Sequence, residues 1–408
     1  MVKKPVRSIV AAISAAAARW IDGTFAPRVR ALAEVSARTG YGEPSVEGAF
    51  DRLFGSLERD RIEAVITDEL GSLDVLDRFV ERDGRPRARA LPVGRVCVLS
   101  SRTTIGVAIV PAVFALCAKC DVLVKDREDH LVAAFFATLI DQLPELRASL
   151  GAKQWDGKSD AHDLGGFDAV VVFGSDTSLT AIAAQLPHST RFIPHGSKAS
   201  AGYVARDALK SWAAAQALAE RAAMDLLLYE TEGCLSLHAL FVERGGAVSP
   251  EQFGQMFGAI LCAAAVDLPV GPPDARRVAR LAMARDMAAF RGAEQEALVS
   301  DAAASYLLVM DPPWDEPPPF VSRMLPIRSV DAPSQVADYF IRHGVSVEAL
   351  AVAGSRADLA EAAARMGAAR VTAFGLLQSP EIGDFHGGRP RIAEFVRWIS
   401  DERIGFET

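Results

Sequence analysis

The residues best suited to covalent chemistry lie around Cys234, in the stretch 230–238 that reads Glu-Thr-Glu-Gly-Cys-Leu-Ser-Leu-His. Together with the apolar run 239–242, this stretch predicts the end of a helix, a turn and then a strand. Gly233 has no Cβ, so the backbone can turn tightly just before the thiol. A thiolate on such a turn is a good nucleophile toward an acyl carbon, and neighbouring amide N–H groups could hold the oxyanion that forms.

Two residues of this stretch leave alternatives open. A lone cysteine is more often a buried small hydrophobe than a nucleophile, and the local sequence alone favours that role for Cys234. His238 could act as a general acid or base, or it could face away, because alternation along a strand decides where its side chain points.

Composition and charge exclude some classes of protein. At 408 residues the chain is long enough for two or three domains, and its 24% of charged residues is ordinary for a globular protein. The net charge of −8 leaves no basic footprint for nucleic acid. The odd count of five cysteines indicates a reducing compartment. Cys117-x-x-Cys120 has no second pair nearby, which favours packing, so we expect no metal site.

The N-terminus mimics a secretory signal, since residues 1–7 are basic and residues 8–18 are apolar. The apolar part is mostly alanine and Arg19 follows it, which favours a soluble helix with one buried face. A second apolar run, 105–118, is shorter than the roughly 20 residues that a membrane span needs. We therefore expect a cytoplasmic protein without a membrane span.

Element signals divide the chain into a helical part and an alternating α/β part. Up to about Ala90 the pattern predicts helices at 8–21, 28–39, 45–56 and 59–70. Beyond Val93 it predicts strands at 95–99, 121–125, 169–173 and 191–194, between helices at 105–118, 130–141 and 179–184. Such alternation implies a parallel sheet covered on both faces, a Rossmann-like arrangement. After Cys234, helices at 250–266, 274–290 and 334–343, strands at 306–310 and 324–329, and an αβ unit at 356–374 indicate a second α/β domain.

The segment around Cys234 resembles the nucleophile segment of the acyl-CoA reductase family (LuxC type) that makes fatty aldehyde for bacterial bioluminescence, a branch of the aldehyde dehydrogenase superfamily. That family commonly reads Gln-Gln-Gly-Cys-Leu-Ser-Pro-His here, so Thr231, Glu232 and Leu237 are departures. The tail resembles the family as well, in the phrases at 384–390 and 396–398.

The resemblance covers roughly residues 40–400 and implies an aldehyde dehydrogenase-like α/β fold. We expect an N-terminal helical segment (1–92), a Rossmann-like nicotinamide cofactor-binding domain (93–223), a catalytic domain (224–375) and a tail (376–408) that packs back on the core. The superfamily lacks the Gly-x-Gly-x-x-Gly fingerprint of conventional dinucleotide folds, and this chain lacks it too.

Two strand ends resemble the superfamily's cofactor elements. Residues 122–128 (Val-Leu-Val-Lys-Asp-Arg-Glu) resemble the strand whose lysine and glutamate face the adenosine ribose, which assigns Lys125, Arg127 and Glu128 to the cofactor. Cations suit a 2′-phosphate and a carboxylate suits free ribose hydroxyls, so we expect NADPH, with NADH as the alternative. A solvated charge run after a strand is the plain alternative. Gly174 and Ser175 resemble the turn that opens a helix against the pyrophosphate, and Glu316 resembles the glutamate at the nicotinamide ribose.

The resemblance also reveals departures that bear on catalysis. Arg102 lies near the position of the superfamily's oxyanion-holding asparagine, and it could donate hydrogen bonds in its place. Pro194 falls where the superfamily places the glutamate that activates the deacylating water. The family's Gly-x-Lys-x-Ser phrase at this point is matched by Gly196, Lys198 and Ser200.

The sequence thus predicts an NAD(P)H-dependent acyl-CoA reductase that forms an aldehyde through a Cys234 acyl-enzyme. A relative of the same fold that carries acyl groups without reducing them efficiently is the alternative. Arg102 and Glu232 motivate it, because a carboxylate beside the cysteine should raise the pKa of the thiol. The expected partners are an acyl thioester, acyl-transferring proteins and further copies of the chain.

Overall fold

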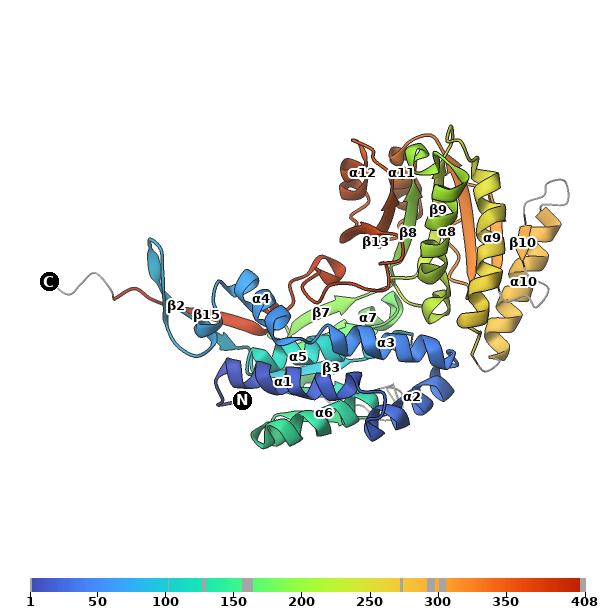
Figure 1. Cartoon of the computed structure of the whole chain (residues 1–408). Coiled ribbons are helices and arrows are strands. Elements are labelled where there is room, and N and C mark those ends of the chain that lie inside the picture. Colours follow the sequence, from blue (N-terminus) through green and yellow to red (C-terminus); the bar gives the residue numbers. More distant parts are fainter. Residues whose placement is uncertain are drawn as a thin grey trace. The chain divides into compact units, whose positions relative to one another are not determined.

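Two compact units make up the chain in a computed structural model, which describes residues 2–101, 103–126, 130–155, 164–271, 274–291, 298–300 and 306–403. Unit 1 consists of Met1–Thr39, Glu47–Gly196 and Glu381–Thr408, and unit 2 of Gly40–Val46 and Ser197–Pro380. Each unit contains a largely parallel sheet with helices on its faces (Figure 1). The expected α/β fold class is confirmed.

Unit 1 is built on a five-stranded parallel sheet in the order β5-β4-β3-β6-β7. Its strands are β3 (Arg95–Leu99), β4 (Asp121–Lys125), β5 (Leu150–Lys153), β6 (Ala169–Phe173) and β7 (Arg191–His195). Helices α5 (Ile109–Cys117) and α6 (Leu131–Gln142) pack against β3, β4 and β5, and α7 (Asp176–Ala183) packs against side chains of β3 and β6. The four predicted strands are confirmed within one residue. The edge strand β5 was not predicted, because Leu-Gly-Ala-Lys carries little β signal.

Four helices at the N-terminus confirm the helical prediction for that region: α1 (Val6–Ile21), α2 (Ala26–Thr39), α3 (Glu43–Gly55) and α4 (Arg59–Leu70). Helix α1 buries one apolar face, including Ile9, Ile13 and Trp20, and packs mainly on α6. The indole Nε1 of Trp20 donates a hydrogen bond to Thr138 Oγ1 of α6 at 3.1 Å. A residue that is fully buried thus still satisfies its one polar atom.

Residues 80–82 and 85–92 form two strands, which corrects the expectation of helix up to about Ala90. Strands β1 (Val80–Arg82) and β2 (Arg85–Pro92) form an antiparallel sheet with β15 (Val396–Asp401), in the order β1-β2-β15. Arg87 Nη2 lies 2.7 Å from Asp401 Oδ2 across the β2–β15 pair. The partner strand lies about 300 residues further along the chain, so a local pattern rich in arginine could not reveal the pairing.

Unit 2 contains a seven-stranded sheet in the order β10-β11-β12-β9-β8-β13-β14, in which only the β10–β11 pair is antiparallel. The strands are β8 (Ala199–Val204), β9 (Leu237–Glu243), β10 (Leu298–Ser300), β11 (Leu307–Met310), β12 (Met324–Val330), β13 (Val347–Ala353) and β14 (Arg370–Ala373). Helices α11 (Pro333–His343) and α12 (Leu359–Arg365) cover one face. Helices α8 (Trp212–Leu227), α9 (Pro250–Asp267) and α10 (Ala275–Arg291) lie on the other (Figure 1).

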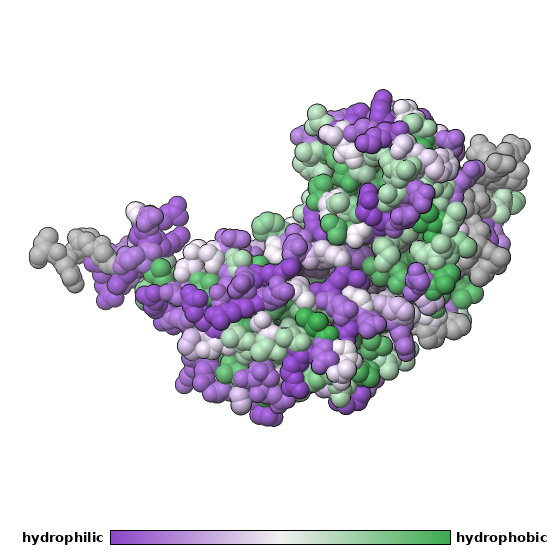
Figure 2. Space-filling model, viewed as in Figure 1, coloured by the Kyte–Doolittle hydropathy of each residue, from purple (hydrophilic) through white to green (hydrophobic). Residues whose placement is uncertain are grey.

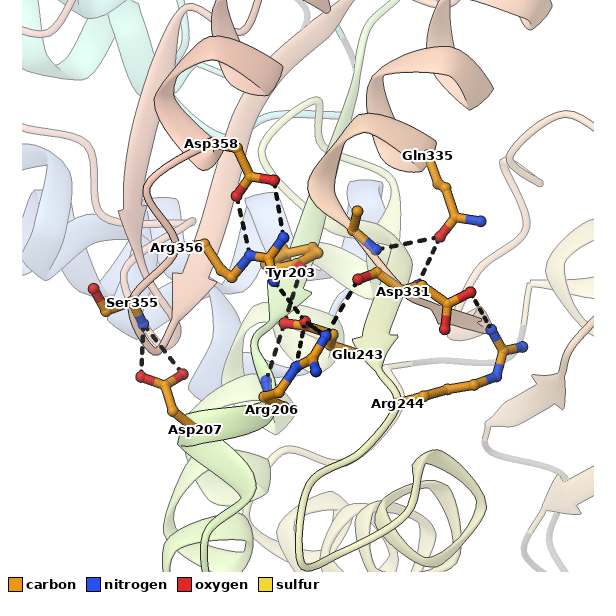
Figure 3. A network of polar contacts seen from close by, with 11 residues as sticks. Tyr203, Arg206, Asp207, Glu243, Arg244, Asp331, Gln335, Ser355, Arg356 and Asp358 are labelled. Atoms are coloured by element: carbon orange, nitrogen blue, oxygen red, sulfur yellow. Dashed lines mark hydrogen bonds and ion pairs between the residues drawn. The ribbon is translucent and has the colours of Figure 1, made fainter.

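A buried carboxylate joins the carboxyl ends of the central strands of unit 2 (Figure 3). Glu243, the last residue of β9, is fully buried and accepts hydrogen bonds from Tyr203 Oη at 3.1 Å and Arg206 Nε at 2.6 Å. Arg356 Nη1 donates to it at 2.9 Å and also forms a bidentate pair with Asp358. Two arginines therefore compensate one buried charge, and the network ties β8, β9 and the segment after β13 together.

Helices α8, α9 and α10 carry several exposed apolar side chains, interspersed with polar ones (Figure 2). The largest are Trp212, Val266, Val278, Met283, Met287 and Phe290. Exposed apolar surface of this kind is common at protein–protein interfaces. The expected assembly into a homo-oligomer stays a prediction.

In the part of the chain that the structure describes, no single helix is both long and apolar enough to cross a membrane. The bent pair α1 and α2 meets the length and composition criteria only when the two helices are taken together.

Candidate active site

In unit 1, Lys125 lies at the carboxyl end of β4, where the fold is expected to bind a ligand. Its side chain is largely buried, and the ammonium lies 5.0 Å from the ring centroid of Trp155. The next residue, Asp126, accepts a hydrogen bond from the backbone N–H of Val132 in the first turn of α6. The strand end is therefore a rigid position from which a lysine can present positive charge.

Gly174 and Ser175 follow β6 and open helix α7, as the sequence predicts. Ser175 is the N-cap residue, and its Oγ accepts a hydrogen bond from the backbone N–H of Ser178 at 3.3 Å. The first turn of α7 is exposed. Free N–H groups and the helix dipole make such a turn suited to an anion. Strand β3 separates β6 from β4, so this turn and Lys125 share one edge of the sheet with one strand between them.

Of the remaining residues predicted to contact the cofactor or the oxyanion, the structure describes Glu316. Arg102, Arg127 and Glu128 lie outside the described residues. Glu316 lies in unit 2, in the loop between β11 and β12. Its backbone carbonyl accepts hydrogen bonds from Tyr339 Oη at 2.9 Å and from Arg328 Nη2 at 3.3 Å, so this part of the proline-rich loop is anchored to the unit.

In unit 2, the backbone before Cys234 has an unusual conformation. Tyr229, Glu230 and Thr231 all have positive φ, at 54°, 52° and 58°. The left-handed region costs a residue with a Cβ about 1–2 kcal/mol, and such strain persists only where the surroundings enforce it. The tight turn that the sequence predicts at Gly233 is thus formed mainly by these three residues, which precede Gly233 in the chain. A second turn follows, closed by the hydrogen bond from Ser236 N to Gly233 O at 2.9 Å, and it contains Cys234.

A buried ion pair enforces the left-handed turn. Arg323 donates to both carboxylate oxygens of Glu230, at 2.5 and 3.0 Å, and to the carbonyl of Leu268 at 2.9 Å. Its backbone N–H donates to Thr231 Oγ1 at 3.2 Å, and that hydroxyl donates to Leu226 O at 2.8 Å. Burial raises the pKa of Glu230, and the Arg323 guanidinium opposes that shift. The segment between α8 and β9 is therefore fixed by charge-assisted hydrogen bonds.

Cys234 is held at the amino-terminal edge of the sheet by Ser200 of β8. Ser200 Oγ donates to the carbonyl of Cys234 at 2.7 Å and accepts from the backbone N–H of Ala349 at 3.1 Å. Cys234 keeps part of its surface exposed, although protein atoms surround the thiol densely. The turn is thus anchored to both β8 and β13, and the residue that carries the thiol stays partly exposed.

The charges around Cys234 act on its thiol in opposite directions. Burial raises the pKa of the thiol to about 12, and the Glu348 carboxylate acts in the same direction. Lys198 and the backbone N–H groups of Cys234 and Leu235 lower it. The cysteine is therefore a protonated thiol at neutral pH. The two N–H groups that favour a negative charge on sulfur are the amides that the sequence pointed to for an oxyanion.

The other cysteines have different surroundings. Cys97, Cys117 and Cys120 are buried in unit 1, as expected of packing residues, and burial raises the pKa of each thiol. Cys120 Sγ donates to Phe395 O at 3.5 Å. Cys262 is exposed on α9. Cys234 is thus the cysteine that combines partial exposure with a turn of backbone amides.

Glu232 does not act on the thiol as the sequence suggested. Arg277 of α10 forms a bidentate ion pair with it, at 2.7 and 2.9 Å, and Tyr41 Oη donates to it at 3.3 Å. The guanidinium of Arg277 also lies over the ring of Tyr41. This pair neutralises Glu232, and the carboxylate that raises the pKa of Cys234 is Glu348 instead.

His238 lies in β9 and is almost fully buried. Its Nδ1 accepts a hydrogen bond from the backbone N–H of Ser200 at 3.2 Å, and its ring centroid is 5.1 Å from that of Phe320. Burial lowers the pKa of His238 to about 4, so the ring is neutral at pH 7. Ser200 thus bonds to both Cys234 and His238, and it occupies the lone pair through which Nδ1 could act as a base.

The depressed pKa of His238 predicts a pH-dependent stability. The unfolded chain binds a proton at His238 below about pH 6.5 and the folded chain does so only near pH 4, so the free energy of unfolding falls as the pH falls through this window. The loss amounts to roughly 3 kcal/mol. His238→Asn keeps an acceptor for the Ser200 N–H and cannot titrate, so urea unfolding at pH 7.5, 6 and 5 should show a shallower acid loss.

The comparison of the variant with the wild type isolates this effect, because other groups titrate in the same window. Burial raises the pKa of Asp225 to about 7, so ionisation of that carboxyl gives a slope of the opposite sign. His343→Asn is the matched control, because His343 lies at the end of α11, where it contacts Trp314 O. This variant should lose as much unfolding free energy between pH 7.5 and pH 5 as the wild type. An equal acid loss in wild type and His238→Asn would contradict a buried neutral histidine.

The two edges of the unit 2 sheet differ. Cys234 and Ser200 lie at the amino-terminal edge, whereas a pocket of about 300 Å³ lies at the carboxyl ends of β13 and β14. Its lining includes Gly354, Phe374 and Arg221. Strand β9 alone spans roughly 20 Å, so the pocket and the thiol are separate features.

Sequence reasoning named some of these neighbours without assigning them a role and missed others. Lys198 and Ser200 belong to the Gly-x-Lys-x-Ser phrase, which was the available signal for them. Glu348 and Arg323 reach the Cys234 region only through strand pairing and a loop, so no local pattern indicated them.

Comparisons with known proteins show which family and which fold the chain resembles. The family model described as "Acyl-CoA reductase (LuxC)" matches residues 1–398. An oxidoreductase from Marinobacter aquaeolei is similar in structure, with a TM-score of 0.72 and 13% sequence identity over 97% of this chain and 85% of that chain. A NAD-dependent benzaldehyde dehydrogenase from Corynebacterium glutamicum gives 0.70 and 15%, with 98% and 86% covered. Aldehyde dehydrogenase 21 from Physcomitrella patens, in complex with the product succinate, gives 0.72 and 10%, with 98% and 87% covered.

Among curated proteins, none matches the chain significantly in sequence. At such low identities, the likeness to the solved structures shows the fold alone, and that fold is the aldehyde dehydrogenase fold expected from the sequence. The family model spans almost the whole chain and agrees with the resemblance seen around Cys234. The chain therefore belongs to the acyl-CoA reductase (LuxC) family.

Proposed function

We propose that the protein reduces a fatty acyl thioester, such as an acyl-CoA, to an aldehyde, with Cys234 as the nucleophile. The observation that supports this most is the placement of the thiol, partly exposed on a turn whose amides favour negative charge and which Ser200 anchors to two strands. Such a turn can hold an acyl group in one orientation and stabilise the tetrahedral oxyanion.

The acyl-transfer half of the reaction uses the residues of unit 2. Cys234 loses its proton, its sulfur attacks the acyl carbon, and the thiol of CoA leaves with a proton. The backbone N–H groups of Cys234 and Leu235 are the proposed donors to the oxyanion. Arg102, outside the described residues, is the proposed third donor. His238, proposed from the sequence as an acid or base, is better suited by its hydrogen bond to Ser200 to orienting the turn.

The cofactor half of the reaction uses unit 1. The exposed, Ser175-capped turn of α7 suits a pyrophosphate, and Lys125 at the end of β4 suits the negatively charged adenosine end of a dinucleotide. Gly174, Arg127 and Glu128 complete the proposed set there, and Glu316 is the proposed contact of unit 2 to the nicotinamide ribose. A bound nicotinamide supplies the hydride that turns the Cys234 thioester into a thiohemiacetal, which then releases aldehyde.

Steady-state aldehyde formation from acyl-CoA and NADPH tests this proposal against its alternative, an acyl carrier with impaired reduction. The proposal expects aldehyde to accumulate over many turnovers in proportion to NADPH consumed. Covalent acylation without aldehyde would favour the acyl carrier. The ion pair between Glu232 and Arg277 removes one of the two reasons for that alternative.

Cofactor choice gives a further prediction. With Lys125 and Arg127 beside Glu128, we expect a modest preference for NADPH over NADH, because two cations attract the 2′-phosphate that one carboxylate repels. Lys125→Met should lower kcat/KM for NADPH more than kcat/KM for NADH. Lys153→Met, at the end of the neighbouring strand β5, is the control. A preference of the wild type for NADH by about tenfold would contradict the prediction.

A further inference from the structure

Two charged residues lie at the same edge of the unit 2 sheet as Cys234, and the steps above do not use them. Lys198 precedes β8, and Glu348 is the second residue of β13. Lys198 Nζ lies 2.9 Å from Glu348 Oε2, and their side chains are only 19% and 4% exposed. A pair so shielded from water interacts with nearby charges more strongly than a surface pair does.

Strand register connects this pair to the nucleophile. Strands β8 and β13 pair in parallel, with Val347 opposite Ala199. Ser200 bridges them, because its Oγ accepts from Ala349 N and donates to Cys234 O. Ser200, two residues after Lys198, therefore links the carbonyl of Cys234 to Ala349, the residue after Glu348.

The other charged groups around the nucleophile turn have partners of their own. Glu232 is paired with Arg277 of α10, and Glu230 with Arg323 of the loop before β12. His238 of β9 is a neutral ring at pH 7. The Glu348 carboxylate acts against ionisation of the thiol, and the Lys198 ammonium acts in favour of it.

We propose that Lys198 and Glu348 are a positioning pair that sets the fraction of Cys234 present as thiolate, with Lys198 favouring the thiolate and Glu348 opposing it. The inference rests on the proposed function only in taking Cys234 as the nucleophile. Burial is the main cause that keeps the thiol protonated in the resting protein, Glu348 acts in the same direction, and Lys198 stabilises the anion once the thiol ionises.

The rate of Cys234 alkylation by iodoacetamide between pH 7 and 10.5 tests the pair, followed by mass spectrometry of the peptide that contains Cys234. Removing a charge near a thiol shifts its pKa by about one unit or more, and the lower nucleophilicity of a less basic thiolate offsets part of the gain. Glu348→Gln should therefore raise the rate at a fixed pH below the pKa roughly threefold to tenfold. Lys198→Met should lower it by a similar factor.

Opposite changes in the alkylation rate distinguish this role from a structural one. If the ion pair only held the fold, Glu348→Gln and Lys198→Met would both break it and would change the rate in the same direction. Lys198→Arg keeps the charge and should keep the wild-type profile. Arg365→Gln removes a charge from the exposed pair with Asp338 and should have no effect. Changes in the same direction in both variants, or unchanged profiles, would overturn the proposal; if Glu348→Gln does not fold, Lys198→Met and Lys198→Arg decide it.

The alkylation assay needs neither acyl-CoA nor a nicotinamide, so it fails or succeeds independently of the proposed reductase activity. Shifted alkylation profiles without aldehyde formation would support the role of the pair and contradict the reductase activity. Normal aldehyde formation with unshifted alkylation profiles would contradict only the proposed role of the pair.

Discussion

Cys234→Ala should abolish both covalent acylation by labelled acyl-CoA and aldehyde formation, a loss of at least ~10³-fold. The reason is chemical, because without the sulfur no thioester can form on the protein for a hydride to reduce. The variant should remain folded, because the residue is only partly buried and the turn is held by backbone bonds and Ser200. Protein-bound label and aldehyde are measured in the same reaction.

The other four cysteines supply the controls. Cys262→Ala changes an exposed residue on α9 and should keep full activity and labelling. Substitution of Cys97, Cys117 or Cys120 affects the core of unit 1, where stability and not labelling is the property expected to change. Acyl label retained in Cys234→Ala would refute the assignment of the nucleophile.

Arg323→Met should lower the free energy of unfolding by about 3–5 kcal/mol, the usual cost of leaving one member of a buried ion pair without its partner. Arg323 is almost fully buried, and its partner Glu230 is one of the three left-handed residues before Cys234. Urea unfolding at pH 8 measures the change. Aldehyde formation should fall as well, because the strained turn loses the contact that enforces it.

The pH dependence of that variant provides the sharper check. Burial already raises the pKa of Glu230, and removing Arg323 raises it further. A carboxyl whose folded pKa lies above its unfolded value stabilises the fold below the unfolded pKa of about 4.3, and that stability is lost as the pH rises through the folded pKa. Arg323→Met should thus be less destabilised at pH 5 than at pH 8.

The control for Arg323 is Arg365, whose pair with Asp338 is exposed. Arg365→Met should change stability by less than about 1 kcal/mol at either pH. An Arg323→Met variant as stable as Arg365→Met would mean that the left-handed turn does not depend on the buried pair.

Periodicity and composition predicted the local elements of this fold well. The first four helices and the strands β3, β4, β6 and β7 have apolar runs that match their period, and their existence follows from that pattern. The pairing of β2 with β15 could not be predicted this way, because it joins residues about 300 positions apart. Strand β8 (Ala199–Val204) was missed because Ala-Ser-Ala-Gly is a poor strand sequence, stabilised here by central burial between β9 and β13.

The candidate site also contains residues that the sequence indicated and residues that only the structure reveals. Cys234 and its turn were visible in the sequence, because a glycine, a thiol and a following strand are contiguous. Glu348 and Arg323 were not, because they approach the turn from β13 and from a loop. Ser200 of β8 was named through the Gly-x-Lys-x-Ser phrase, but its hydrogen bond to Cys234 was not predicted. Glu232 shows the reverse case, since adjacency suggested an effect on the thiol that its ion pair with Arg277 removes.

The proposed reaction requires a Cys234 acyl-enzyme that hydride discharges, and a chase experiment can follow both events. Enzyme is mixed with labelled acyl-CoA in the absence of reduced cofactor, and protein-bound label, free fatty acid and aldehyde are followed over minutes before and after NADPH is added. With Pro194 where the superfamily has its hydrolytic glutamate, we expect the acyl-enzyme to lack that base, which is typically worth about 10²–10⁴-fold, so the label should persist on Cys234 and appear as aldehyde once NADPH is present. Rapid release of free fatty acid without NADPH, or persistent label that NADPH does not discharge, would contradict it.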